Sequence, residues 1–189
     1  MIRIGILGDI GSGKSYVAKK FGYPVFDADY EVSKLYKKDK KIFKKLKKKL
    51  QKQISSFPIN KNEITKAILS NKVNIQKIIS IVHLEIRKIL KLFLKKNRNK
   101  KVIILDIPLL LENKINNKND ILIFVDSKKI EIEKRLKKRL NFNRKLINKF
   151  KKIQFSSSYK KRRSNFIIKN NFKKKSLNKS IKKILNEIL

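Results

Sequence analysis

Short continuous apolar runs alternate along the chain with longer stretches in which apolar residues recur every three or four positions. The short runs have the length and β-branched composition of buried strands, and they cover 2–7, 24–26, 102–105, 121–125 and 165–168. The longer stretches have helical spacing, and they cover 14 onward, 30–53, 61–70, 74–96, 130–140, 144–161 and 176–189. Strands that alternate with helices predict an α/β fold, with a central parallel sheet of about five strands covered on both faces.

The absence of repeats and linkers favours one domain over residues 1–189. Hydrophobic residues make up 41% of the 189, which is enough for a packed core. With no cysteine and His83 as the one histidine, disulfides, thiol nucleophiles and His- or Cys-ligated metal sites are excluded, and a Ser-His-Asp triad is improbable. We find no signal peptide and no membrane-spanning run, and therefore expect a cytoplasmic protein without a membrane partner.

Charge is the most unusual property of the composition. Lys and Arg number 52 against 14 Asp and Glu, which gives a formal charge of +38. Such a charge can indicate a nucleic-acid partner, but lysines occupy nearly every polar position from Lys19 to Lys183. Lysine, isoleucine and asparagine share A/T-rich codons, so base composition explains the same excess. We favour that explanation and expect no specific nucleic-acid partner, only nonspecific binding at low salt.

One motif carries clear chemistry. Residues Gly8–Ser15 fit the phosphate-loop pattern G-x-x-x-x-G-K-[ST] without a mismatch, with a strand before it and a helix after it. Backbone N–H groups of such a loop cradle phosphates, Lys14 can bridge the β- and γ-phosphates, and the Ser15 hydroxyl can ligate Mg²⁺. A chance glycine-rich turn is the less favoured alternative. The motif predicts nucleotide binding and leaves the acceptor open.

Carboxylates follow two other strands, at the edge of the sheet that carries the phosphate loop. Asp27 and Asp29 can orient or deprotonate an acceptor hydroxyl or help to hold a metal. Asp27 can equally be a helix N-cap, whereas for Asp29 we favour the functional interpretation over the cap. Asp106 stands where a Walker B carboxylate would reach Mg²⁺. Arg135 and Arg139 lie four apart on one expected helical face and can close over a triphosphate, or can simply be solvated.

In this order the motifs resemble those of the dephospho-CoA kinases, a family of P-loop kinases, over nearly the whole chain. The matching elements are G-x-I-G-S-G-K-S at 8–15, V-x-D-A-D at 25–29, His83, L-D-I-P-L-L-x-E at 105–112, R-L-x-x-R at 135–139, Gln154, and the strand that ends at Asn170. The second and fourth elements are the most discriminating, because shikimate and nucleoside-monophosphate kinases share only the loop.

The resemblance implies transfer of the ATP γ-phosphate to the ribose 3′-hydroxyl of dephospho-CoA, which gives CoA and ADP in the last step of CoA biosynthesis. It implies catalytic roles for Lys14, Asp29 (the base) and Arg139, and Mg²⁺ on Ser15 and Asp106. ATP would be bound by Gly8, Gly11, Ser12, Gly13, Lys14, Ser15, Tyr16, Arg135 and Arg139, and the acceptor by Asp27, Asp29, His83, Pro108 and Leu109. A lid near 128–160 and an acceptor-binding helical region near 30–95 would close over the site of a monomer.

The chain departs from the family pattern at several positions that bear on acceptor affinity and catalytic efficiency. Asp9 replaces a usual glycine, Tyr16 a threonine, Ser33 an arginine and Leu84 a proline, Thr65-Lys66 replace Asp-Arg, and Lys149 is the basic residue before Gln154. For His83, a hydrogen-bonded structural role stays open beside a role in shaping the acceptor pocket. Two further alternatives are a nucleic-acid-associated P-loop ATPase and a P-loop kinase with another small-molecule acceptor.

Overall fold

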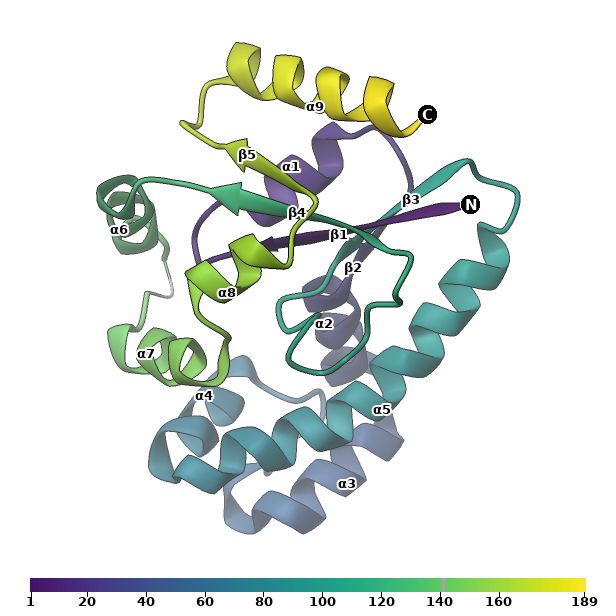
Figure 1. Cartoon of the computed structure of the whole chain (residues 1–189). Helices are drawn as coiled ribbons and strands as arrows, with labels where there is room; N and C mark the ends of the chain where they lie inside the picture. Colours follow the sequence, from purple (N-terminus) through teal and green to yellow (C-terminus); the bar gives the residue numbers. More distant parts are fainter. Residues whose placement is uncertain (141) are drawn as a thin grey trace. The chain divides into compact units, whose positions relative to one another are not determined.

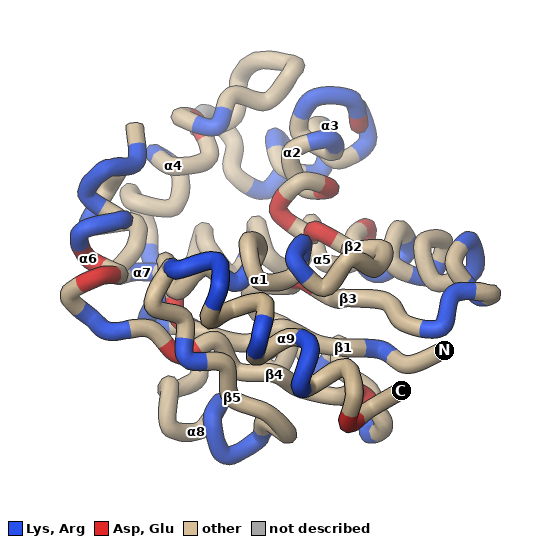
Figure 2. The backbone as a smooth tube through the Cα atoms, turned by 90° about the horizontal axis from the view of Figure 1, so that it is seen from above, with Lys and Arg blue, Asp and Glu red and all other residues tan. Residues whose placement is uncertain are grey.

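The computed structural model describes residues 1–140 and 142–189, apart from the side chain of residue 52. The chain divides into two compact units, Met1–Asp27 with Asn97–Leu189, and Ala28–Lys96. Figures 1 and 2 show the helices and strands of both units. The second unit corresponds to the helical region predicted at 30–95, whose role in acceptor binding stays a prediction, as does the single domain over 1–189.

A five-stranded parallel sheet forms the centre of the first unit, in the order β2-β3-β1-β4-β5. The strands are β1 (Ile2–Gly8), β2 (Val25–Asp27), β3 (Val102–Asp106), β4 (Ile121–Asp126) and β5 (Phe166–Lys169). The predicted α/β fold with about five parallel strands is therefore confirmed. Because the strands are parallel, the loops that follow β1, β2 and β3 leave the sheet at one edge, where ligands bind in such folds.

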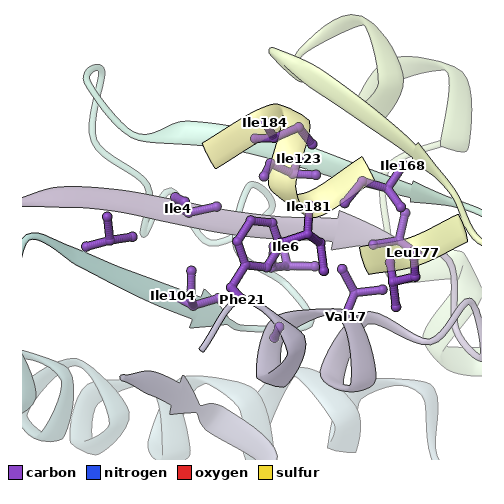
Figure 3. Close-up of a cluster of buried hydrophobic side chains, with 13 residues drawn as sticks. Ile4, Ile6, Val17, Phe21, Ile104, Ile123, Ile168, Leu177, Ile181 and Ile184 are labelled. Atoms are coloured by element: carbon purple, nitrogen blue, oxygen red, sulfur yellow. The ribbon is translucent and has the colours of Figure 1, made fainter. Parts of the chain in front are cut away.

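Two helices cover one face of this sheet, α1 (Lys14–Lys20) and α9 (Lys174–Ile188). Between sheet and helices lies a cluster of buried apolar side chains (Figure 3). Its members are Ile4, Ile6, Val17, Ala18, Phe21, Val102, Ile104, Ile123, Val125, Ile168, Leu177, Ile181 and Ile184. Alternate residues of β1 and β4 point into this cluster, as the period of two along a strand requires.

The intervening residues of the strands face the opposite side. Gly5 of β1 lies so close to Leu110 that a Cβ there would be 2.6 Å from the Leu110 Cδ2. The ring of Phe124 in β4 lies under Lys161 of α8 (Ser157–Arg162), with the ammonium 5.5 Å from the ring centroid. The loop after β3 and α8 therefore cover this second face. Two further helices of the unit are α6 (Lys129–Lys137) and α7 (Arg144–Ile153).

The second unit is helical, and its longest element is α5 (Lys72–Lys96), which contacts the other three α-helices. Those are α2 (Ala28–Lys38), α3 (Lys40–Leu50) and α4 (Lys61–Ser70), with a short 3₁₀ helix at Gln51–Gln53. Apolar residues at helical spacing form the core, and they include Ile42, Leu46, Ile78, Val82 and Ile86. The lysines of α3 lie on the solvent side of this amphipathic pattern.

Two helices predicted as continuous are each interrupted, so those predictions are wrong in this respect. The stretch 30–53 breaks at Asp39, whose carboxylate accepts hydrogen bonds from the N–H groups of Lys41 and Ile42 and begins α3. The stretch 144–161 breaks after Ile153, and the Ser156 hydroxyl caps α8 by accepting from Tyr159 N–H. Short capping side chains thus end one helix and begin the next.

No helix in the described part of the chain is both long enough and apolar enough to span a membrane.

Candidate functional site

The phosphate loop connects β1 to α1 and has a backbone that favours glycine. Gly11 and Gly13 have φ angles of 89° and 92°, in the left-handed region. A Cβ on Gly13 would lie 2.6 Å from Nδ2 of Asn170, and one on Gly11 would lie 2.9 Å from Cγ of Leu136. The motif's glycines are therefore required by both conformation and space, and α6 and the end of β5 pack directly against the loop.

Two side chains from other strand ends hold the loop at Ser12. The hydroxyl of Ser127, after β4, and the amide Nδ2 of Asn170, after β5, each donate a 2.9 Å hydrogen bond to the Ser12 carbonyl. Ser12 is 0% exposed, and its own hydroxyl oxygen has no hydrogen-bond partner among the described residues. A buried hydroxyl without a partner inside a glycine loop fits a site for an anionic phosphate.

Lys14 is the first residue of α1, and its ammonium turns back onto the loop. Its Nζ donates to the carbonyl oxygens of Gly8 at 3.1 Å and Asp9 at 2.9 Å. Ser15 and Tyr16 follow on the exposed surface of α1. The side chains predicted to bind ATP around Lys14 thus lie within one short segment.

Two of the predicted carboxylates stand beside each other at the carboxyl edge of the sheet. Asp27 ends β2 and Asp106 ends β3, and the two are register partners in this parallel pair. Asp106 is 4% exposed. Mg²⁺ prefers oxygen ligands and usually takes one or two carboxylates together with substrate phosphates. Asp106 and the Ser15 hydroxyl are oxygen donors of that kind, although among the described residues no three His, Cys, Asp or Glu side chains cluster.

The two predicted lid arginines do not share a helical face, so that prediction is wrong. α6 ends at Lys137, and the Arg139 N–H bonds to the carbonyl of Leu136 in a tighter final turn. Arg135 remains in the helix, and its guanidinium carbon lies 4.2 Å from the ring centroid of Phe172. Arg135 therefore faces the segment after β5, while Arg139 extends from the turn beyond the helix.

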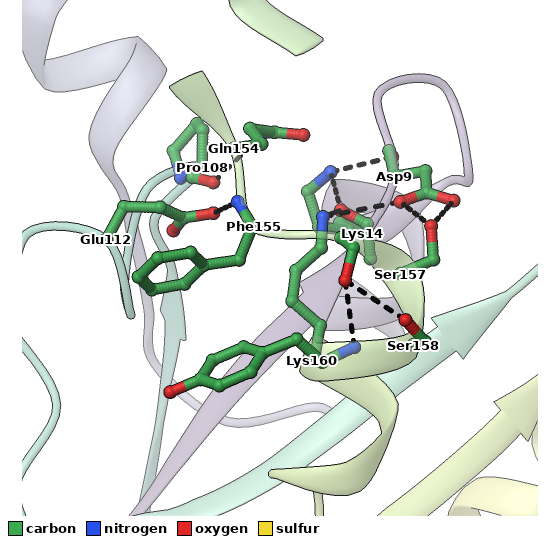
Figure 4. A network of polar contacts seen from close by, with 12 residues as sticks. Asp9, Lys14, Pro108, Glu112, Gln154, Phe155, Ser157, Ser158 and Lys160 are labelled. Atoms are coloured by element: carbon green, nitrogen blue, oxygen red, sulfur yellow. Dashed lines mark hydrogen bonds and ion pairs between the residues drawn. The ribbon is translucent and has the colours of Figure 1, made fainter. Parts of the chain in front are cut away.

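The segment from Gln154, which the resemblance named, to Lys160, which it did not, connects several parts of the site (Figure 4). Gln154 Nε2 donates to the Pro108 carbonyl at 3.2 Å, and Phe155 N–H donates to Glu112 at 2.8 Å. Further along, Ser157 Oγ lies 2.7 Å from both carboxylate oxygens of Asp9. The segment therefore joins the loop after β3, including the predicted substrate residues Pro108 and Leu109, to the phosphate loop.

Asp29 and His83 belong to the second unit. Asp29 lies in the first turn of α2, two residues after the end of β2, and His83 is half-buried on α5. Of the departures from the family pattern, Ser33 lies on α2, Thr65-Lys66 on α4 and Leu84 on α5. The roles of Asp29 and His83 stay predictions.

Comparison with known proteins decides the family. The family model described as CoaE, dephospho-CoA kinase, matches residues 2–176. The chain belongs to the dephospho-CoA kinase family. The dephospho-CoA kinase of Wolbachia sp. subsp. Brugia malayi is 32% identical over 190 residues, covering 98% of this chain and 97% of the relative. That of Rickettsia felis is also 32% identical over 190 residues, covering 98% and 96%.

Solved structures agree on the fold of this dephospho-CoA kinase family member. TT1252 from Thermus thermophilus superposes with a TM-score of 0.80 at 24% identity, covering all of this chain and 98% of that one. The dephospho-CoA kinase from Campylobacter jejuni gives 0.58 at 21% identity, with 98% and 96% covered. The family assignment confirms the prediction of an ATP-dependent kinase of CoA biosynthesis. It takes the place of the two alternatives, a nucleic-acid-associated ATPase and a kinase with another small-molecule acceptor.

Proposed function

We propose that the chain transfers the γ-phosphoryl group of Mg²⁺-bound ATP to the ribose 3′-hydroxyl of dephospho-CoA, with the phosphate loop and Asp106 at the donor and Asp29 at the acceptor. The observation that carries the proposal is the juxtaposition, at one sheet edge, of the phosphate loop and the Asp27–Asp106 pair. We further expect a cytoplasmic monomer without a membrane partner, and only nonspecific polyanion binding.

The donor half of the site rests on the phosphate loop. Its backbone N–H groups and the buried Ser12 hydroxyl would bind the phosphates, and Lys14 would bridge the β- and γ-phosphates. The Ser127 and Asn170 bonds to the Ser12 carbonyl keep the loop preorganised for this purpose. Arg135 near the end of α6 and Arg139 in the turn beyond it would add positive charge to offset the negative charge that develops during transfer.

The donor set described above suits a magnesium ion held by Ser15 and Asp106. When bound there, Mg²⁺ would neutralise charge on the β- and γ-phosphates. Asp106 at the end of a central strand and Ser15 after Lys14 on α1 would hold the ion there.

In the transfer step, the acceptor 3′-oxygen forms a bond to the γ-phosphorus while the bond from that phosphorus to the β–γ bridging oxygen breaks. The hydroxyl proton passes to the Asp29 carboxylate, and ADP leaves with the bridging oxygen. Asp27, His83, Pro108 and Leu109 would contact the acceptor. Positions of this kind determine orientation, which is most of what a phosphoryl-transfer site provides.

An Asp29→Asn variant tests the assignment of the base, with Asp39→Asn as a matched control that alters a helix cap in the same unit. We expect the kcat for CoA formation to fall about 10²- to 10⁴-fold in Asp29→Asn, with the KM for ATP within about twofold of wild type. Asp39→Asn should keep its kcat. A kcat for Asp29→Asn within threefold of wild type would remove Asp29 from the mechanism.

A further inference from the structure

Lys160 is a buried lysine on α8 that the donor site as described so far does not use. Lys160 is 3% exposed, and its Nζ lies 3.3 Å from the Gly8 carbonyl oxygen and 3.3 Å from Asp9 Oδ1. Lysines are almost never buried unless a partner compensates the charge. Here the partner is the carboxylate at the position where the family usually has glycine.

Two ammonium groups therefore converge on one carbonyl of the phosphate loop. Gly8 O accepts from Lys14 Nζ at 3.1 Å and from Lys160 Nζ at 3.3 Å. Gly8 itself is buried at the end of β1, so its carbonyl needs a donor at all times. A lysine that reaches toward the β- and γ-phosphates has to loosen its bonds to the loop carbonyls, and the second ammonium can keep Gly8 O satisfied.

We infer that Lys160 is a positioning residue for phosphate binding: it takes over the Gly8 carbonyl and thereby releases Lys14 for the nucleotide phosphates. The inference rests on the proposed use of Lys14 in binding ATP. Lys160 acts through Lys14 and is not itself assigned to a reacting atom.

Asp9 and Ser157 support the position of Lys160 through an ion pair and a hydrogen bond. The Asp9 carboxylate offsets the charge of Lys160, which otherwise stands beside a second cation. Ser157 Oγ, 2.7 Å from both oxygens of that carboxylate, orients it from the same short helix that carries Lys160. In this chain the departure at Asp9 is thus matched by two residues of α8, and the loop and α8 act as one unit.

The test compares Lys160→Met with Lys161→Met, its neighbour on α8, which pairs with Asp126 at 2.9 Å. Binding of Mg²⁺·ADP is measured by calorimetry, alongside KM values for ATP and dephospho-CoA and the melting temperature. In Lys160→Met we expect the Kd for ADP and the KM for ATP to rise about tenfold or more, as for loss of one charge-assisted hydrogen bond. The KM for dephospho-CoA should stay within about twofold of wild type. Lys161→Met should change the Kd for ADP and both KM values by no more than about twofold.

An unchanged ADP affinity in Lys160→Met overturns the inference. So does a rise of both KM values by the same factor, because a merely structural role would disturb donor and acceptor binding alike. If Lys160→Met does not fold, Ser157→Ala supplies the test: it keeps both charges, frees the Asp9 carboxylate, and should raise the Kd for ADP about threefold. An unchanged Kd in Ser157→Ala then overturns the inference.

A double-mutant cycle tests the ion pair itself. We expect Asp9→Asn to change ADP affinity by factors that differ at least threefold between the wild-type and Lys160→Met backgrounds. Equal factors in the two backgrounds contradict the pairing. Failure of the proposed function is distinguishable: a wild-type protein that makes no CoA, but whose ADP binding depends on Lys160, refutes the acceptor and leaves this inference standing.

Discussion

Gly13→Ala tests how tightly the phosphate loop is built. Alanine at a φ of 92° would be strained, at a cost of about 1–2 kcal/mol. Its Cβ would also lie 2.6 Å from Nδ2 of Asn170, a 3% exposed residue whose amide donates to the Ser12 carbonyl. Displacing that amide breaks a buried hydrogen bond, which costs about 1–3 kcal/mol more. The expected loss of stability is therefore about 2–5 kcal/mol.

Gly22→Ala is the matched control, because Gly22 also has a positive φ, 75°, but a Cβ there meets nothing within 4 Å. It should lose only the conformational part, about 1–2 kcal/mol. Urea unfolding followed by circular dichroism gives the free energies of unfolding. Amide hydrogen exchange in β1 measures the stability of the unit that carries the loop. Calorimetry with Mg²⁺·ADP should show weaker binding for Gly13→Ala alone.

Equal losses of stability in the two variants would refute this reasoning. They would mean that the contact between Gly13 and Asn170 does not constrain the loop. Unchanged ADP binding in Gly13→Ala would show in addition that the loop geometry is not needed for the phosphates.

Three further predictions concern charge. Lys14→Met should lower kcat about 10²- to 10³-fold, because its ammonium offsets charge that develops during transfer; initial rates of ADP release measure this, and a loss below threefold contradicts it. Asp106→Asn should raise the Mg²⁺ concentration for half-maximal rate about tenfold, and an unchanged Mg²⁺ titration removes Asp106 from the metal site. The Ser55 hydroxyl, 2.5 Å from Glu63, lowers the pKa of that carboxyl. The ionised Glu63 side chain therefore stabilises the folded protein above the unfolded pKa near 4.5, and this stabilisation is lost as pH falls through the lowered pKa. Urea midpoints from pH 6 to 3 should therefore fall further for wild type than for Glu63→Gln, and parallel curves would contradict this.

The sheet could be predicted from sequence because its strands are continuous apolar runs, and a strand buried on both faces leaves such a run. The run Val102–Leu105, for example, lies wholly within β3. The phosphate loop could be predicted because its glycines and Lys14 satisfy fixed requirements at fixed spacing.

Helix ends were harder to predict, for a physical reason. Lysines fill the polar positions on both sides of Asp39, so helical periodicity continues across that cap without a change in pattern. At the second cap, Ser156 stands in a short run of serines between two lysine-rich helical stretches, and the pattern of those stretches continues on both sides of the run. The end of α6 at Lys137 has the same cause, and it separated Arg139 from the helical face of Arg135.

The role of Lys160 was hidden by composition. With 52 lysines and arginines in 189 residues, one lysine six positions after Gln154 carries no signal. Its burial and its bond to the Gly8 carbonyl emerge only from the packing of α8 against β1. The sequence marks Asp9 as a departure from the usual glycine, but its two partners from α8 lie far along the chain and cannot be inferred from spacing.

The most direct test of the assigned reaction is product formation by the wild-type protein with Mg²⁺·ATP, with and without dephospho-CoA, and separately with polynucleotide. Chromatography of the products should give CoA and ADP in a one-to-one ratio, with ADP release dependent on dephospho-CoA and unaffected by polynucleotide. ADP release that needs no dephospho-CoA, or that polynucleotide stimulates while no CoA forms, would contradict the assigned reaction.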